Sequence, residues 1–188
     1  MSARVVLGVS GASGAALALD CARALRQVGA SVDLVISPMA RRTLAEEIGP
    51  EAEAALCALA ERVHDIRDLG AAIASGSCPV AGMVVAPCSM RSLAAIAHGL
   101  DDTLLTRAAG VHLRDRRPLV LLARGAPQTL AHLGNMTAAT EMGATILPPV
   151  PAFYLRPASL AEMTAQIAAR AVDLLRLAPP IATPWTPT

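Results

Sequence analysis

The chain is predicted to be an α/β protein, built as one doubly wound parallel sheet with helices on both faces in three αβα layers. Apolar, β-branched runs alternate with alanine- and leucine-rich segments along the 188 residues. The first run ends in three glycines at a spacing of three, directly before a helical segment. Small hydroxyl residues follow several of the apolar runs. Together these observations favour a single domain that binds a ligand at one edge of a parallel sheet.

The first unit is the most informative segment. Residues 5–14 read Val-Val-Leu-Gly-Val-Ser-Gly-Ala-Ser-Gly, and an alanine-rich segment continues to Arg26. This pattern predicts a buried strand, a tight turn and the start of a helix. Glycines let backbone N–H groups approach an anion, and a helix N-terminus carries a partial positive charge. The turn is therefore predicted to cradle the phosphate of a nucleotide or phosphorylated cofactor.

The next elements follow the same alternation. Residues 31–37 are predicted to form a second strand, which ends at Ser37, and residues 38–47 a helix. The alanine-rich stretch 51–62 is predicted to be helical. Residues 81–89 form a central strand that ends in a Pro-Cys-Ser turn.

Helices are predicted over residues 90–98 and 103–113. The second half of the chain repeats the pattern once more, with a buried strand over 119–123, a helix that begins near Thr129 and a short strand over 144–147.

The final helix is predicted over 159–177, because Ser159 and Glu162 form a capping-box signature at its start. A proline-rich tail, residues 179–188, follows in an extended form. We expect residues 1–178 to form the ligand-binding domain and the tail to pack on the site or on a neighbouring subunit.

The hydroxyl residues at the strand ends are predicted to meet in one site. Ligands of open α/β sheets bind outside the carboxyl ends of the strands. An isolated serine at such a place is usually only a helix N-cap, and that reading stays open for each of them alone. The residues concerned are Ser10, Ser13, Ser37, Ser89 and Ser92.

Composition excludes several other classes of protein. Hydrophobic residues make up 54% of the chain, and its mean hydropathy is +0.48. No run of about 18 apolar residues lacks a charge, so we expect no membrane span. We expect no signal peptide either, and assign the apolar surplus to a buried sheet and subunit contacts. A net charge of +1 argues against nucleic-acid binding.

Two residue counts narrow the chemistry further. All 16 basic residues are arginine, which excludes a Schiff-base lysine and a complete Walker A loop. The four cysteines are widely spaced and indicate buried thiols in a reducing cytoplasm. No spacing indicates a metal site.

Four motifs in order carry a specific resemblance. They are Ser-Gly-Ala-Ser-Gly (10–14), Ala-Pro-Cys-Ser-Met-Arg-Ser-Leu (86–93), Arg-Arg-Pro-Leu-Val-Leu (116–121) and Pro-Pro-Val-Pro-Ala-Phe-Tyr (148–154). From Arg4 to Trp185 the chain resembles the UbiX family of flavin prenyltransferases. The resemblance implies a Rossmann-like, flavodoxin-like fold, with residues 1–178 binding flavin, in a homo-oligomer that is often a dodecamer.

The resemblance also implies an activity. The family joins the dimethylallyl group of dimethylallyl phosphate to N5 and then to C6 of reduced FMN, without a metal. The product, prenylated FMN, is the cofactor of UbiD-type decarboxylases, which would be the partner served in the cytoplasm.

Site residues follow by matching motifs. The implied FMN contacts are Gly11, Ala12, Ser13, Ser37, Ser89, Met90, Arg91, Ser92 and Arg124. The implied catalytic residues are Ser13, beside flavin N5, and Glu47, which we expect to have a raised pKa near a desolvated flavin and to move protons. The implied contacts of dimethylallyl phosphate are Arg114, Tyr154, Arg170 and Trp185.

The sequence departs from the family at three positions. Arg114 replaces a lysine, Gly125 replaces a glutamate linked to the proton steps, and Leu155 replaces a common histidine. The glutamate's loss favours an alternative, an FMN-binding paralogue that stores or delivers flavin without efficient prenyl transfer.

A second alternative is an FMN-dependent oxidative decarboxylase of peptidyl cysteine. It requires a Pro-Ala-Ser-Ala-Asn-Thr motif where this chain has Pro-Cys-Ser-Met-Arg-Ser, and an early catalytic histidine that the context of His64 does not match.

Overall fold

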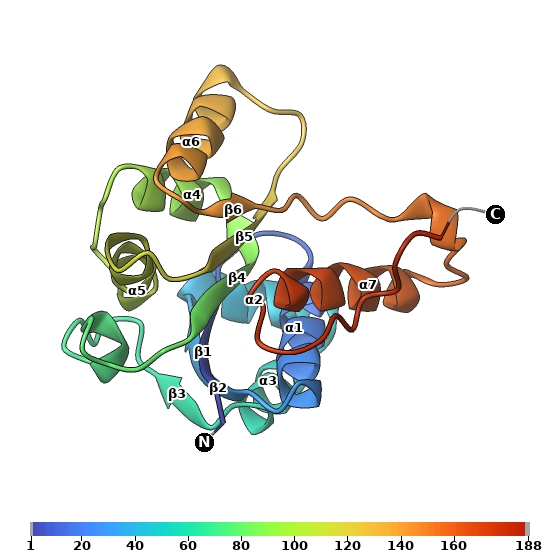
Figure 1. Cartoon of the computed structure of the whole chain (residues 1–188), viewed down its shortest axis with the longest axis horizontal. Coiled ribbons are helices and arrows are strands. Elements are labelled where there is room, and N and C mark those ends of the chain that lie inside the picture. The colour runs from blue at the N-terminus through green and yellow to red at the C-terminus, as the bar shows by residue number, and fades with distance from the viewer. Residues whose placement is uncertain (1, 187–188) are drawn as a thin grey trace.

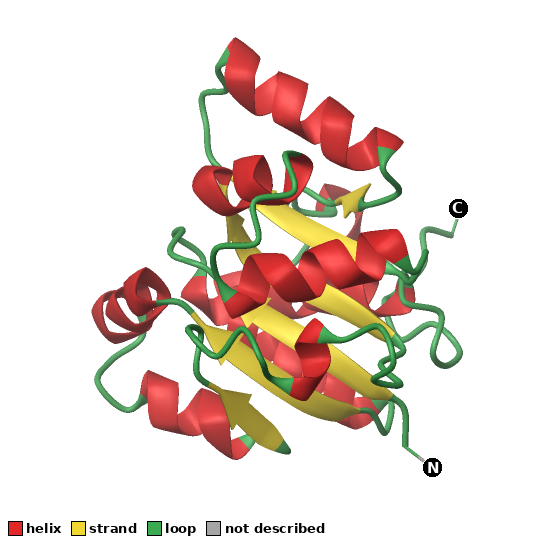
Figure 2. Cartoon of the chain, turned by 90° about the vertical axis from the view of Figure 1, so that its left-hand side faces the viewer, coloured by secondary structure: helices red, strands yellow, loops and turns green. Residues whose placement is uncertain are grey.

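The computed structural model describes residues 2–186 and contains one six-stranded sheet between two layers of helices (Figures 1 and 2). The strands are β1 (Arg4–Val9), β2 (Ser31–Ile36), β3 (Arg62–His64), β4 (Gly82–Ser89), β5 (Leu119–Arg124) and β6 (Thr145–Ile146). The helices are α1 (Ala15–Gln27), α2 (Pro38–Glu47), α3 (Ala52–Ala58), α4 (Met90–Ala97), α5 (Leu104–Arg114), α6 (Leu130–Glu141) and α7 (Leu160–Asp173), with the 3-10 turns η1 (Ala72–Ala74) and η2 (Phe153–Leu155).

The strand order is β3-β2-β1-β4-β5-β6, and every pairing is parallel. Without the short edge strand β3, the remaining five strands have the flavodoxin order 2-1-3-4-5. The fold class predicted from the sequence is confirmed. The direction of winding reverses between β1 and β4, so the carboxyl ends of these two strands form the place where ligands of such sheets bind.

The sheet separates two apolar cores. Alternate residues of β1 point to opposite faces: Val5, Leu7 and Val9 pack with α1, α2, α3 and α7, whereas Val6 packs with α4, α5 and the loop around Ile73. Both cores are rich in alanine, which lets the helices lie close to the sheet. The predicted three-layer arrangement is confirmed.

The predicted helix over 51–62 is wrong at its end. Helix α3 stops at Ala58, and residues 62–64 form β3. Strand β3 has only three residues, two of them exposed, so it lacks the apolar run that marks a buried strand. Its position depends on distant contacts, since His64 Nε2 lies 2.7 Å from Asp33 Oδ1 on β2.

The final helix is shorter than predicted, because it ends at Asp173 instead of continuing to residue 177. The chain turns there, with Arg176 in the left-handed backbone region at φ 56°. The tail then runs back along α7, and it is described as far as Thr186; the predicted tail residues 187–188 lie outside the described part of the chain.

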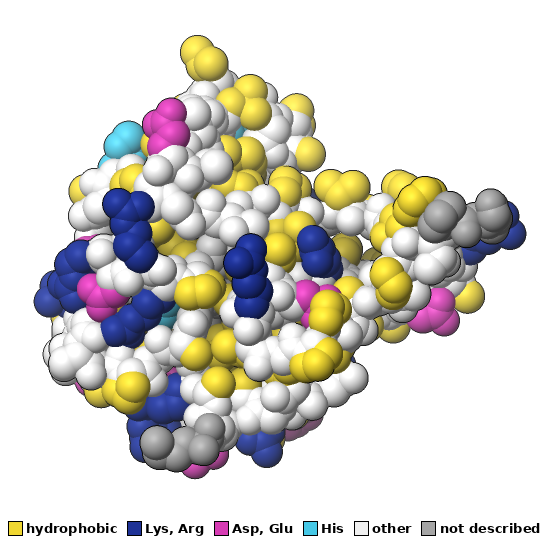
Figure 3. Space-filling model, viewed as in Figure 1, with side chains coloured by type: hydrophobic (Ala, Val, Ile, Leu, Met, Phe, Trp, Pro, Cys, Tyr) yellow, Lys and Arg dark blue, Asp and Glu magenta, His cyan; other side chains and the backbone are white. Residues whose placement is uncertain are grey.

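An arm projects from the body of the molecule (Figure 1). It consists of the segment 148–158, the first turns of α7 and the end of the tail. Figure 3 shows hydrophobic side chains along it. The exposed large side chains of this arm are Val150, Phe153, Tyr154, Leu160 and Trp185. Apolar surface of this extent on a projecting segment is typical of a protein contact surface.

Candidate flavin and prenyl-donor site

Ser10 joins the two strands at the point where the winding reverses. Its hydroxyl donates to the Pro87 carbonyl at 3.0 Å and accepts from the Ser89 N–H at 2.7 Å. The Ser10 side chain is buried, so its hydroxyl provides partners for two backbone groups at the ends of the strands. Ser10 therefore fixes the ends of β1 and β4 relative to each other, as a structural residue under the site.

The glycine turn is required by a close approach of two segments. A Cβ on Gly11 would lie 2.2 Å from the Cβ of Met39 on α2, so no larger residue fits there. Gly14 has φ +109°, a backbone conformation that L side chains rarely adopt. These glycines let the loop 10–14 pass against α2 and then turn into α1.

Glu47, the last residue of α2, caps α1. Its Oε2 atom accepts from the N–H groups of Gly14 and Ala15, both at 2.8 Å. Burial acts to raise the pKa of the Glu47 carboxyl, but donation by these two N–H groups and by the Ser13 hydroxyl, together with the charge of Arg124, lowers the pKa below its ordinary value. The expectation of a raised pKa for Glu47 is wrong, because hydrogen bonds to the charged form outweigh desolvation.

The predicted phosphate cradle is therefore partly filled by the protein itself. Glu47 takes the Gly14 and Ala15 N–H groups that a phosphate would otherwise use. In the described part of the chain, the N–H groups of Gly11 and Ser13 donate to no protein acceptor. These two groups remain available to a ligand at the turn.

A first cavity, of about 350 Å³, lies beside this turn at the ends of β1, β2 and β4. Ser37 and Ser89 line it and also cap helices, with Ser37 Oγ accepting from Ala40 N–H at 3.1 Å and Ser89 Oγ from Ser92 N–H at 3.2 Å. N-capping and a place in the cavity are thus compatible. The cavity brings together the predicted FMN contacts Gly11, Ser37, Ser89, Arg91 and Ser92.

Arg91 stands at the N-terminal turn of α4 and is paired with Asp102. No sequence pattern indicates this partner, because Asp102 lies in the loop before α5. The pair is exposed, so Arg91 can still present donors to an anion in the cavity.

A second cavity, of about 570 Å³, lies on the other side of the turn. It brings together Ser13, Glu47 and Arg124, which the sequence assigns to the flavin. Its remaining wall is mostly apolar and comes from α1, the end of α2, the proline-rich segment and α7; it includes Leu17, Ile48, Pro149, Pro151, Leu160, Met163 and Ile167. A flat ring system with polar edges suits such a lining.

A third cavity, of about 440 Å³, is lined by Tyr154, Arg170 and Trp185, three of the four residues predicted to contact the prenyl donor. Ile167 of α7 lines both this cavity and the second one, so the two adjoin. The third cavity combines a cationic group and a hydroxyl with an apolar wall from prolines 148, 180 and 184.

Arg114 is not brought to this site within one chain. It ends α5 at the amino edge of the sheet, opposite the strand ends that form the site, and its Nε donates to Asp115 Oδ1 at 3.0 Å. Two further predicted contacts, Ala12 and Met90, belong to the loop and to α4 but do not line the three cavities. Met90 instead packs beside Gly125, whose Cβ would lie 3.0 Å from Met90 Cε.

Residues 2–186 lack two other kinds of functional feature. These residues contain no cluster of three histidine, cysteine or acidic side chains that could hold a metal ion. None of their helices combines the length and the apolar character that crossing a bilayer requires.

The site lies where the winding of the sheet reverses, and it combines hydroxyls, helix N-termini and a glycine turn with a cavity large enough for a ring system. This combination defines an α/β protein that binds a phosphorylated aromatic cofactor. A family profile described as flavoprotein matches residues 1–170. The chain belongs to the flavoprotein family and, within it, to the UbiX flavin prenyltransferases.

Curated relatives support this assignment. Flavin prenyltransferase UbiX of Thauera aromatica is 46% identical over 183 residues, covering 97% of this chain and 94% of that one. The protein of the same description from Deinococcus radiodurans is 48% identical over 177 residues, covering 94% and 90%.

Solved structures agree. AnUbiX (PadA1), crystallised with FMN and dimethylallyl pyrophosphate, superimposes with a TM-score of 0.95 at 39% identity over the full length of both chains. A dodecameric FMN-dependent UbiX-like decarboxylase from Escherichia coli O157:H7 gives a TM-score of 0.92 at 38% identity, covering 98% of this chain and 100% of that one. The FMN-dependent cysteine decarboxylase TvaF is 15% identical with a TM-score of 0.65, a likeness of fold alone.

Proposed function

We propose that this chain joins the dimethylallyl group of dimethylallyl phosphate to N5 and C6 of reduced FMN, forming prenylated FMN. The observation that carries the proposal is the adjacency of two cavities across Ile167. One holds Ser13, Glu47 and Arg124, and the other holds Tyr154, Arg170 and Trp185. An acceptor ring and a prenyl donor placed in them would lie next to each other, as a transfer reaction requires.

The residues present fit FMN. We assign its phosphate to the first cavity, where Arg91, the hydroxyls of Ser37 and Ser89 and the N-terminus of α4 offer donors to an anion. We assign its ring to the second cavity, between Arg124 and the apolar wall of α7. Reduced FMN supplies the nucleophilic ring atoms; the protein orients them and excludes water.

The donor's two ends suit the third cavity. Arg170 offers two parallel N–H donors and Tyr154 a hydroxyl to the phosphate. Trp185 and the surrounding prolines offer an apolar wall to the prenyl chain, and an aromatic face also stabilises nearby positive charge. The released phosphate can accept the proton lost on ring closure, which makes the glutamate replaced by Gly125 dispensable.

Glu47 serves in this proposal as a fixed anion. Its lowered pKa keeps it ionised at neutral pH, so it orients the Ser13 hydroxyl and balances Arg124. A carboxylate in this state is a weak base, and proton transfer through it would be slow compared with transfer to phosphate.

We further propose a homo-oligomer, of the dodecameric kind seen in the Escherichia coli relative. The exposed apolar arm needs a covering surface, and Arg114 can reach a donor site only in a neighbouring copy. Residues 1–178 would then form the flavin-binding domain, with the tail on the site. A UbiD-type decarboxylase would receive the product.

The experiment is mass spectrometry of the flavin extracted after anaerobic incubation with reduced FMN and dimethylallyl phosphate. FMN heavier by one five-carbon prenyl unit supports the proposal. Unmodified FMN that stays bound, with product formed only by Gly125→Glu, would favour the storage or delivery paralogue instead. The glutamate can be accommodated at position 125 if the flexible Met90 side chain shifts.

A further inference from the structure

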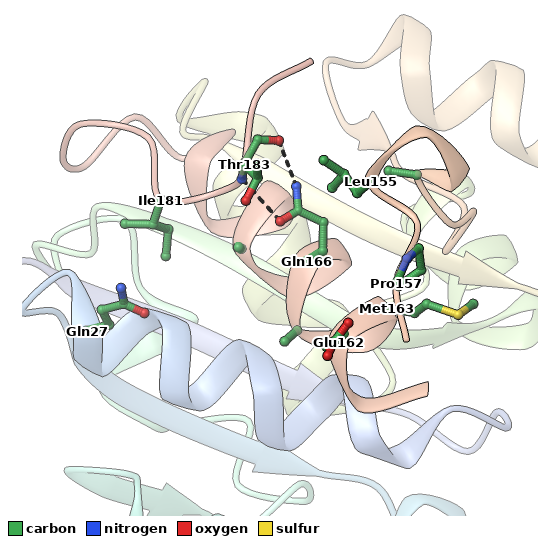
Figure 4. Close-up of a pocket in the computed structure, with 11 residues that line it drawn as sticks. Gln27, Leu155, Pro157, Glu162, Met163, Gln166, Ile181 and Thr183 are labelled. Atoms are coloured by element: carbon green, nitrogen blue, oxygen red, sulfur yellow. Dashed lines mark hydrogen bonds between the residues drawn. The ribbon is translucent and has the colours of Figure 1, made fainter. Parts of the chain in front are cut away.

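The C-terminal tail is held on α7 by two side chains. Gln166 Nε2 donates to the Thr183 carbonyl at 3.0 Å, and Gln166 Oε1 accepts from the Thr183 N–H at 3.1 Å (Figure 4). The amide thus completes a two-way pair with one backbone unit, as a neighbouring strand would. Asp173 accepts from the next tail groups, with Oδ1 to Ile181 N–H at 2.8 Å and Oδ2 to Ala182 N–H at 3.1 Å.

The spacing of these contacts fixes the course of the tail. Gln166 and Asp173 lie seven residues apart, on one face of α7 two turns apart. Asp173 holds residues 181–182 and Gln166 holds residue 183, so the tail runs antiparallel to the helix. This course brings Trp185 to the cavity of Tyr154 and Arg170, although the residue is 63% exposed.

The same contacts also affect whether Arg170 is paired with an acidic side chain. An aspartate three residues after an arginine on a helix lies close enough to pair with it. Asp173 instead has both oxygens committed to the tail, and in the described part of the chain Arg170 forms no ion pair. The guanidinium is therefore left available at the cavity it lines.

We propose that Gln166 and Asp173 are positioning residues that hold the tail so that Trp185 closes one side of the prenyl-donor cavity and Arg170 stays free for a phosphate. The identity of the ligand rests on the proposed function; the attachment of the tail does not.

The first test uses the chain's only tryptophan, Trp185, as its own probe in the purified full-length protein. Gln166→Leu, Asp173→Ala and the double variant are expected to lower the fluorescence anisotropy of Trp185 and to increase its quenching by acrylamide. Asp173→Asn, which keeps one acceptor oxygen, should fall between wild type and Asp173→Ala. The matched controls are Gln128→Leu, in the loop before α6, and Asp101→Asn, in the loop before α5; neither residue lines a cavity that the tail lines, and both variants should behave as wild type.

The second test measures how tightly the prenyl donor binds. Titrating Trp185 fluorescence with dimethylallyl phosphate should give a dissociation constant about tenfold higher for Gln166→Leu and for Asp173→Ala than for wild type. This is the loss of affinity expected when two hydrogen bonds no longer hold a binding group in place. In the prenyl-transfer assay the KM for dimethylallyl phosphate should rise by a similar factor, while kcat changes less.

Unchanged anisotropy and quenching in the double variant would overturn the proposal, since the tail would then be held by other contacts. A mobile Trp185 with an unchanged dissociation constant would also overturn it. Failure of the wild-type protein to form product, with the fluorescence effects intact, would instead count against the proposed function.

Discussion

The Ser10 hydroxyl accepts a hydrogen bond from the Ser89 N–H at 2.7 Å and thereby joins the carboxyl ends of β1 and β4. The two residues are 79 positions apart in the chain. Because the first cavity opens directly beyond them, this bond sets the distance between the glycine turn and the N-terminus of α4.

Ser10→Ala should destabilise the fold. The change leaves the Ser89 N–H without its buried acceptor, which costs about 1–3 kcal/mol. Urea unfolding should show the loss, whereas Ser75→Ala, at an exposed position, should be nearly neutral. Equal stability of the two variants would mean that water replaces the Ser10 hydroxyl.

Two glycine substitutions should have opposite signs. Gly11→Ala places a Cβ 2.2 Å from Met39 Cβ, and relieving such an overlap costs about 1–3 kcal/mol. Gly134→Ala, inside α6 with open space around the added carbon, should stabilise by up to about 1 kcal/mol through helix propensity. Thermal melting of both variants measures this, and a stable Gly11→Ala protein would show that α2 can move away from the turn.

Glu47→Gln should change how stability depends on pH. Because the pKa of Glu47 is lower in the folded protein than its ordinary value of 4.5, the ionised carboxylate stabilises the fold at pH values above 4.5. This stabilisation is lost as the pH falls through the pKa of Glu47 in the folded protein. We expect the variant to be less stable at neutral pH by about 1 kcal/mol or less, as for loss of a helix cap. The difference from wild type should vanish in acid, measured by urea unfolding over a pH series; a constant difference would exclude ionisation as its cause.

Alkylation of the native protein should be confined to Cys57. Burial raises the pKa of the Cys88 thiol to about 12 and that of Cys21 further, and Cys78 is also buried, whereas Cys57 is half-buried. Mass spectrometry after iodoacetamide treatment should find one modified cysteine, and Cys57→Ser should abolish the labelling. Labelling of Cys88 would reveal opening of the central strand.

The sequence alone determined the order of the elements and the fold class. Apolar runs such as 5–9 and 119–123 are buried on both faces, so their composition marks them as strands whatever surrounds them. It also determined which residues gather at the carboxyl edge, because parallel strands all end there: Ser37, Ser89 and the glycine turn lie at one cavity as predicted. The resemblance to a family added Tyr154, Arg170 and Trp185 to the predicted site residues, and these three line the third cavity together.

Only the tertiary structure decided the contacts between distant segments. Strand β3 exists through pairing with β2 and the bond between His64 and Asp33, for which its own three residues carry no pattern. The pKa of Glu47 is lowered, where the sequence led us to expect a raised value, because the fold places two N–H groups at the start of α1 against its carboxylate. Whether Arg170 forms an ion pair with Asp173 depends on where the tail returns along α7. Local pattern specifies which element a residue joins, but charge and hydrogen bonding depend on neighbours that only folding supplies.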